Sequence, residues 1–249
     1  MKNGRNSFTL VELLASIIII AVITTVATGF YLDYVKRAKV AKAKSDLGII
    51  ARALMIYQME EDLDIEKDAN LKYLLMGKFL NFLPLDPWGR EYKINPLCGY
   101  VYSEGETITS KDDDIKVYYQ PCLILKRALY IDRNSNGKID NGDVLKLIFT
   151  KYIDGNGKIP KVTTDKTDNE ADLLFSKDVD VSKLSPIDLM ATATYCLINI
   201  TGDAPFTIGK STVTVTENND VFFDCEGFKV LTSTKNQDFA VVIKKPSDL

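Results

Sequence analysis

The sequence predicts an α+β fold: a long N-terminal transmembrane helix packed on a small antiparallel β-sheet, with an additional β-rich C-terminal region. Two observations predict it. The run from Leu13 to Leu32 carries no charge, and as a helix it is about 30 Å long, the thickness of a bilayer core. Farther along the chain, short segments rich in β-branched and aromatic residues alternate with turn residues, which is typical of antiparallel strands.

The chain begins with a short polar leader, residues 1–7, in which Lys2 and Arg5 are basic. The apolar run that follows is longer than the core of a secretory signal, and no A-x-A-like cleavage site comes after it. A plain membrane anchor leaves Glu12 unexplained, because a carboxylate at the head of a membrane helix costs roughly 2–3 kcal/mol. Glu12 therefore has either a charged partner or a place among the lipid head groups.

The segment Ser7-Phe8-Thr9-Leu10-Val11-Glu12 resembles the class III signal of type IV pilins and type II secretion pseudopilins. The resemblance implies that a dedicated peptidase cuts between Ser7 and Phe8 and methylates the new amine of Phe8. It also implies that Glu12 pairs with the Phe8 amine of a neighbouring subunit, as a charge-assisted hydrogen bond. Ser7 departs from the family pattern, which prefers glycine at that position, and Gly4 lies three positions too early.

The helix is expected to continue beyond the membrane, from Phe8 to about Glu61, with 13–32 as its transmembrane part. Apolar residues recur at helical spacing along one face of the second half, and they predict packing on a sheet. The alternative, a coiled-coil stalk, needs a longer heptad run. The residues of this stripe are Val40, Ala43, Leu47, Ile50, Leu54 and Tyr57.

Residues 62–160 are interpreted as a β head with acidic loops. Its segment Leu83–Tyr92, LPLDPWGREY, is similar to the signature of the major pseudopilin of type II secretion. In that family a V-Y-S strand, here Val101–Ser103, precedes an acidic loop that binds calcium. The resemblance, which covers residues 8 to 118, implies a calcium site among Asp112, Asp113 and Asp114; the alternative is a solvated loop.

A second acidic loop lies in residues 130–144, YIDRNSNGKIDNGDV. Its oxygen-bearing side chains stand at positions 1, 3, 5, 9 and 12 of a calcium loop, with a glycine at position 6 and a backbone carbonyl expected at position 7. The alternative is a plain hairpin, because Asn-Gly favours a type I′ turn. The candidate ligands are Asp132, Asn134, Asn136, the Lys138 carbonyl, Asp140 and Asp143, and calcium is the expected cofactor.

Residues 161–180 are polar and are interpreted as a linker or exposed loop, and 181–249 as a β-rich appendage. The expected strands in the appendage are Thr212–Thr216, Val221–Asp224, Phe228–Leu231 and Phe239–Ile243.

The even number of cysteines indicates two disulfides in an oxidising compartment, with four free thiols as the alternative. Of the three pairings that four cysteines allow, we expect the local one: Cys98 with Cys122, and Cys196 with Cys225.

Composition narrows the function. The chain has 249 residues, a net charge of −3 and no histidine. The charge argues against a nucleic-acid partner, and the lack of histidine removes Ser-His-Asp, Cys-His and His-zinc sites. No carboxylate pair stands out, so we predict that the chain is not an enzyme.

The resemblance implies a structural subunit of a type II secretion pseudopilus, processed by prepilin peptidase and assembled into a filament through its N-terminal helix. A type IV pilin or minor pilin acting in adhesion or DNA uptake is the alternative. The expected partners are further copies, other pseudopilins, the peptidase, an inner-membrane assembly platform and membrane lipid.

We expect a single-pass protein of the bacterial inner membrane with its C-terminal head in the periplasm; an extracellular filament is the alternative location. The positive-inside rule alone predicts the opposite orientation. Basic residues are more numerous after the span than before it: Lys36, Arg37, Lys39, Lys42 and Lys44 against Lys2 and Arg5. We nevertheless expect the head in the periplasm, because the family resemblance and the even number of cysteines both favour that side.

Overall fold

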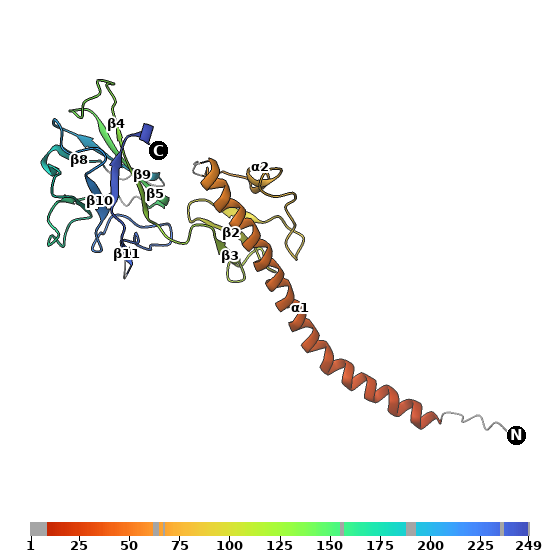
Figure 1. Ribbon diagram of the computed structural model, residues 1–249. Helices are drawn as coiled ribbons and strands as arrows, with labels where there is room; N and C mark the ends of the chain where they lie inside the picture. The colour runs from red at the N-terminus through yellow and green to blue at the C-terminus, as the bar shows by residue number, and fades with distance from the viewer. Residues whose placement is uncertain are drawn as a thin grey trace.

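The computed structural model describes residues 9–61, 65–66, 68–154, 157–187, 193–234 and 237–248. Its dominant element is the helix α1 (Leu10–Glu61), whose N-terminal half extends away from the rest of the molecule (Figure 1). Leu10 is 79% exposed and Ile20 63%, which is costly in water and suits a lipid environment. Within the described residues, α1 is the one helix long and apolar enough to cross a membrane.

The second half of α1 packs on a three-stranded antiparallel sheet, in the order β1-β2-β3, beside the short helix α2 (Leu71–Leu75). The strands are β1 (Lys93–Asn95), β2 (Tyr100–Ser103) and β3 (Ile115–Tyr118). The expected apolar stripe is confirmed, because its central residues are fully buried against Tyr92, Val101 and Ile115. We call α2, this sheet and the half of α1 that packs on them the N-terminal domain.

The remainder of the chain forms a second, eight-stranded sheet in the order β6-β7-β10-β13-β4-β5-β9-β8. Neighbouring strands are antiparallel except β6–β7 and β13–β4, which are parallel. The sheet has a core of its own, with Tyr130, Phe149 and Phe222 among the largest buried side chains. We call residues 122–248 the C-terminal domain, and Figure 1 shows it at the far end of the molecule from the exposed part of α1.

The strands of this domain vary in length from two to ten residues. β11 and β12 pair with each other as a separate two-stranded sheet. Two short 3-10 helices, Val181–Lys183 and Pro246–Asp248, complete the domain. The strand bounds are β4 Leu125–Ile131, β5 Val144–Ile153, β6 Val162–Thr163, β7 Leu173–Phe175, β8 Leu184–Pro186, β9 Ala193–Ile200, β10 Thr212–Val215, β11 Ser233–Thr234, β12 Gln237–Asp238 and β13 Val241–Lys244.

The fold class is confirmed, but the expected division of the chain after the helix is wrong. β4 and β5 pair with β13 and β9, so 122–160 belongs to the second sheet and the domain boundary lies near residue 120. The segment 161–180 is not a linker, because it contributes β6 and β7 and buries Leu173 and Phe175. The polar residues of this segment suggested exposure, but polar side chains can be buried when they are hydrogen-bonded. The buried Asp172 accepts hydrogen bonds from the backbone N–H groups of Lys161 and Asp220.

Two of the expected strands, Val221–Asp224 and Phe228–Leu231, are instead the arms of a turn joined by a single bridge between Phe223 and Lys229. The expected strands at Thr212–Thr216 and Phe239–Ile243 correspond to β10 and β13.

The expected local disulfide pairing is also wrong. Cys98, in the turn between β1 and β2, is bonded to Cys225 of the C-terminal domain, with a Cα–Cα distance of 5.5 Å. Cys196 lies in β9 and is buried in the core, and burial raises the pKa of its thiol to about 12. Cys122 is free and exposed. The bond therefore joins two domains instead of closing a loop within one.

Candidate assembly segment and calcium loops

Glu12 lies at the start of α1 in a reciprocal cap with Thr9. The Glu12 Oε2 atom accepts hydrogen bonds from the Thr9 backbone N–H at 3.0 Å and from the Thr9 hydroxyl at 2.9 Å. The Glu12 N–H in turn donates to Thr9 Oγ1 at 3.3 Å. This is a capping box, which satisfies donors at the end of the helix. Ser7 and Phe8 lie outside the described residues.

The rest of the apolar helix satisfies its own polar groups. The hydroxyls of Ser16, Thr24, Thr25 and Thr28 donate to the backbone carbonyls four residues earlier, at 2.7–2.8 Å. Such bonds let hydroxyl side chains enter an apolar environment without a partner on another helix. Glu12 is the one charged residue between Leu10 and Leu32, and its hydrogen-bond partner among the described residues, Thr9, is neutral.

The D-P-W-G segment is a tight turn fastened by a buried acid. Asp86 is 4% exposed, and its Oδ1 atom accepts hydrogen bonds from the backbone N–H groups of Trp88 at 3.0 Å and Arg90 at 2.8 Å. Its Oδ2 atom accepts from the Ser103 hydroxyl at 2.7 Å, which ties the turn to the end of β2. Gly89 has φ +85°, a conformation that favours glycine.

The same turn occurs a second time, in the C-terminal domain, where the sequence reasoning missed it. Asp224 Oδ1 accepts hydrogen bonds from the backbone N–H groups of Glu226 at 3.0 Å and Phe228 at 2.9 Å. Gly227, at φ +81°, stands where Gly89 stands in the first turn. The shared pattern Asp-x-x-Gly was the available signal.

In the first acidic loop, one of the three candidate acids is held inside the loop. Asp113 Oδ2 accepts a hydrogen bond from the Thr107 backbone N–H at 2.7 Å, and this bond lowers the pKa of the Asp113 carboxyl. Gly105 is required opposite it, because a Cβ there would lie 2.3 Å from the Asp113 carbonyl oxygen. Asp112 is exposed and accepts from Ser110, while Asp114 is half-buried beside them.

In the second acidic loop, alternate side chains curl the backbone inward. Asp132 Oδ2 accepts from the Gly137 N–H at 2.8 Å, Asn134 Oδ1 from the Asn136 N–H at 3.0 Å, and Asn136 Oδ1 from the Lys138 N–H at 2.7 Å. Asp140 then accepts hydrogen bonds from the amides of Asn134 and Asn136. Four candidate ligands are therefore brought together: Asp132, Asn134, Asn136 and Asp140.

The other two candidate ligands in this loop have protein partners. Asp143 is fully buried, and its carboxylate accepts hydrogen bonds from the Tyr130 hydroxyl at 2.7 Å and from the backbone of Arg133 and Asp140. Burial acts to raise the pKa of Asp143, but these bonds outweigh it and hold the pKa below its usual value. The Tyr130 oxygen also lies 2.5 Å from the Lys138 carbonyl oxygen.

A buried, unpartnered oxygen occurs in each acidic loop. Asp113 Oδ1 and Asp132 Oδ1 are buried without a hydrogen-bond partner; the other such side-chain atoms in the described residues are nitrogens of Arg90. An orphaned carboxylate oxygen is costly unless a cation satisfies it, and oxygen is the ligand that calcium prefers. Within the described residues no three His, Cys, Asp or Glu side chains converge on one metal position, so a calcium ion here needs amide or carbonyl oxygens as well.

Comparison with known proteins supports the resemblance drawn from the sequence. The prokaryotic N-terminal methylation motif matches residues 2–28. In an alignment 105 residues long, which covers 37% of this chain and 74% of the relative, the sequence is 26% identical to the type II secretion system core protein G of Pseudomonas aeruginosa. No solved structure matches this chain. The chain thus has a prepilin-type N-terminus and a partial likeness to a pseudopilin.

Proposed function

We propose that this chain, with its N-terminal methylation motif, is a structural subunit of a type II secretion pseudopilus. It is cut between Ser7 and Phe8 by prepilin peptidase, methylated on the Phe8 amine, and assembled into a filament through α1. Its role is assembly, not catalysis. The observation that carries the proposal is the single charge of Glu12 on a long, exposed apolar helix that carries this motif.

Glu12 supports the proposal because no cation pairs with its carboxylate in the described part of the chain. Its partner there, Thr9, offers a neutral hydroxyl and a backbone N–H. In an apolar surrounding, an ionised carboxylate gains most from an opposite charge that also donates a hydrogen bond. The amine of a processed Phe8 on the next subunit supplies both, so that each added subunit is selected and held in register.

The location we propose is the inner membrane, with both domains on the periplasmic side. The Cys98–Cys225 disulfide supports an oxidising compartment, since such bonds are rare in the cytosol. The partners in this account are other pseudopilins, the peptidase and an inner-membrane assembly platform.

The proposal is tested with Glu12→Ala in cells that express the full chain. Removing one partner of a buried charge pair costs about 3–5 kcal/mol, so we expect at least about a hundredfold less subunit in sheared filaments. Membrane fractions should contain the normal amount of protein. Ser16→Ala, which removes a locally satisfied hydroxyl one turn later, is the matched control. Normal filament yield from the Glu12 variant would contradict the proposal.

The alternative function is that of a type IV pilin or minor pilin in adhesion or DNA uptake, and the C-terminal domain favours it. That domain has a groove of about 690 Å³ lined by polar residues of the segments 165–169 and 216–218 and by threonines of β10. Deleting the gene should abolish secretion of exoproteins if the first function holds, and surface adhesion or DNA uptake if the second does.

We also propose that calcium binds the two acidic loops. In the second loop the ligands are Asp132, Asn134, Asn136 and Asp140; in the first, Asp113 acts with Asp112 or Asp114. The unpartnered oxygens of Asp113 and Asp132 support this proposal. Bound calcium would neutralise the acids and stiffen loops that hydrogen bonds alone now hold.

Calcium binding is tested by melting the full chain in detergent micelles with calcium and with a chelator. A ligand at a hundred times its dissociation constant stabilises by about 2.7 kcal/mol, which raises Tm by roughly 5–10 °C for a chain of this size. Asp132→Asn and Asp113→Asn should each remove part of the shift, and Asp168→Asn, at an exposed acid elsewhere, should remove none. An unchanged Tm in the unmodified chain would exclude both sites.

A further inference from the structure

A group of five basic residues directly beyond the apolar run is used neither by the assembly contact nor by the calcium loops. We call them the basic collar: Lys36, Arg37, Lys39, Lys42 and Lys44. Because α1 is continuous, they stand about 6 to 18 Å beyond Leu32 along the helix axis. Asp33 is the one acid between Leu13 and Lys44, so this stretch of helix is strongly positive.

Part of the basic collar faces the N-terminal domain. Lys36 Nζ lies 3.5 Å from a carboxylate oxygen of Glu106, and both side chains are well exposed. Lys39 Nζ lies 6.0 Å from the ring centre of Trp88. These weak contacts place Trp88, the single tryptophan of the chain, beside the collar.

The other three cations of the collar are exposed. They are Arg37, Lys42 and Lys44, and they form no ion pair and no side-chain hydrogen bond with the described part of the chain. The nearest acid in sequence, Asp33, balances at most one of them. Three positive charges of α1 are therefore exposed to the surrounding medium just outside the apolar run.

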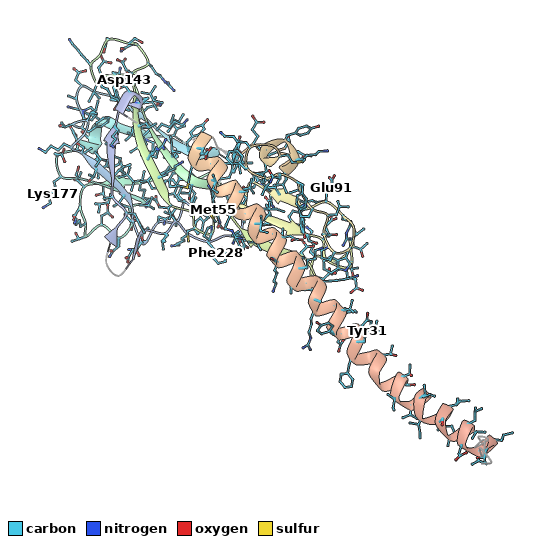
Figure 2. The ribbon with its side chains drawn as sticks, turned by 45° about the vertical axis from the view of Figure 1, so that its right-hand side comes forward. Tyr31, Met55, Glu91, Asp143, Lys177 and Phe228 are labelled. Carbon is cyan, nitrogen blue, oxygen red and sulfur yellow. A yellow bond between two sulfur atoms is a disulfide. The ribbon has the colours of Figure 1, made fainter. Side chains whose placement is uncertain are left out.

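Two exposed tyrosines indicate the level along α1 at which the lipid head groups begin. Tyr31 is 65% exposed and Tyr34 71% exposed, at the end of the apolar run. Figure 2 shows Tyr31 projecting from α1 below the N-terminal domain, on the free part of the helix. Tyrosines are enriched at the level of lipid head groups, because their rings are apolar and their hydroxyls are wet.

We propose that the basic collar binds the anionic head groups of the phospholipid leaflet next to it and so sets the depth of α1 in the bilayer. The Debye length at physiological ionic strength is about 8 Å, so Lys36 and Arg37 lie within reach of a charged surface, and long side chains extend the reach of Lys39, Lys42 and Lys44. Lipid phosphates supply negative charge to Arg37, Lys42 and Lys44, for which the described residues provide no ion pair. The inference rests on the membrane anchoring of the proposed function but holds for either orientation of the chain.

The test measures which lipid gathers around the collar. The full-length chain is placed in phosphatidylcholine vesicles that contain a trace of phosphatidylglycerol or phosphatidylcholine, each dansylated on an acyl chain so that its head group is natural. Trp88 is the energy donor. About 1 kcal/mol per basic residue near the surface corresponds to about fivefold enrichment, so transfer to labelled phosphatidylglycerol should exceed transfer to the neutral lipid severalfold.

Three comparisons decide the outcome. The preference should fall towards parity at about 1 M salt, where the Debye length is 3 Å, and in R37Q/K42Q/K44Q. It should persist in K166Q/K177Q/K210Q, which removes the same charge from exposed sites on the C-terminal domain. Equal transfer to both lipids in the unmodified chain, or a preference that survives R37Q/K42Q/K44Q, would overturn the proposal.

The same measurement separates this inference from the proposed function. No transfer to either lipid would mean that α1 is not in the bilayer, and the membrane anchoring would fail together with the collar. Transfer without preference would refute the collar alone. If R37Q/K42Q/K44Q loses filaments and leaves the lipid preference intact, the cations serve a neighbouring subunit and the lipid proposal is wrong.

Discussion

At the scale of single residues, a buried ion pair of the C-terminal domain lies at the junction of the two domains. Lys151, in β5, lies 3.1 Å from Asp224 through its Nζ atom, and the two side chains are 1% and 2% exposed. The ammonium also donates to the Pro121 carbonyl at 3.3 Å, while Asp224 Oδ1 holds the turn at 224–228. If one partner is removed, no water reaches the other to solvate its charge.

Lys151→Met should therefore destabilise the chain by about 3–5 kcal/mol, because it leaves the Asp224 charge buried and uncompensated. Urea unfolding of the full chain in micelles measures it. K151M/D224N should regain much of the loss, since no charge remains buried. Lys158→Met, in the exposed pair with Asp220, should cost less than about 1 kcal/mol. Equal stability of the Lys151 variant and the unmodified chain would refute this account.

At the scale of elements, α1 changes its role along its length. Its N-terminal half is exposed on all sides and its second half buries one face, so that one helix serves both lipid and a protein core. The change coincides with the end of the apolar run and the start of the basic collar. Leu47 and Ile49, two residues apart, differ completely: Leu47 is fully buried and Ile49 is 46% exposed.

That contrast gives a paired prediction for the N-terminal domain. Leu47→Ala should cost about 2.7–5 kcal/mol, because it removes buried methyl groups and leaves a cavity under β2 and β3. Ile49→Ala should change stability by no more than about 0.5 kcal/mol. Urea midpoints of the two variants in micelles are compared directly. Similar losses in both would mean that α1 does not pack in the way described.

At the scale of the whole molecule, two separate cores are joined at one junction. The disulfide between Cys98 and Cys225 links positions 127 residues apart, next to the Lys151–Asp224 pair. The Tyr118 hydroxyl adds a hydrogen bond to Glu226 at 2.9 Å across the same junction. The C-terminal domain is thereby held in one orientation at the end of α1 (Figure 2).

C98S/C225S should lower the free energy of unfolding by about 4–5 kcal/mol, since a long loop is no longer closed in the unfolded chain. Protease should then cut near residue 120 sooner, while each domain's fragment survives. Cys122→Ser, at the exposed free thiol, is the control and should leave both readouts unchanged. Unaltered cleavage in the double variant would show that the disulfide does not hold the domains together.

The sequence by itself determined the features that depend on neighbours along the chain. The uncharged run of α1, its buried stripe at Ala43, Leu47, Ile50 and Leu54, and the motif around Glu12 all follow from local periodicity or short patterns. The tight turn at Asp86 follows from its prolines and glycine. Helices and turns form by contacts within a few residues, so their pattern can be read directly.

Only the tertiary structure decided the pairings between distant segments. The Cys98–Cys225 bond, the Lys151–Asp224 pair and the placing of β4 and β5 beside β9 and β13 join positions that no local pattern relates. The hydrogen bond between Tyr130 and Asp143, which gives an expected ligand a partner in the protein, belongs with them. Strand pairing and burial are set by the packing of the whole chain, and many arrangements satisfy the same alternation of apolar and polar residues.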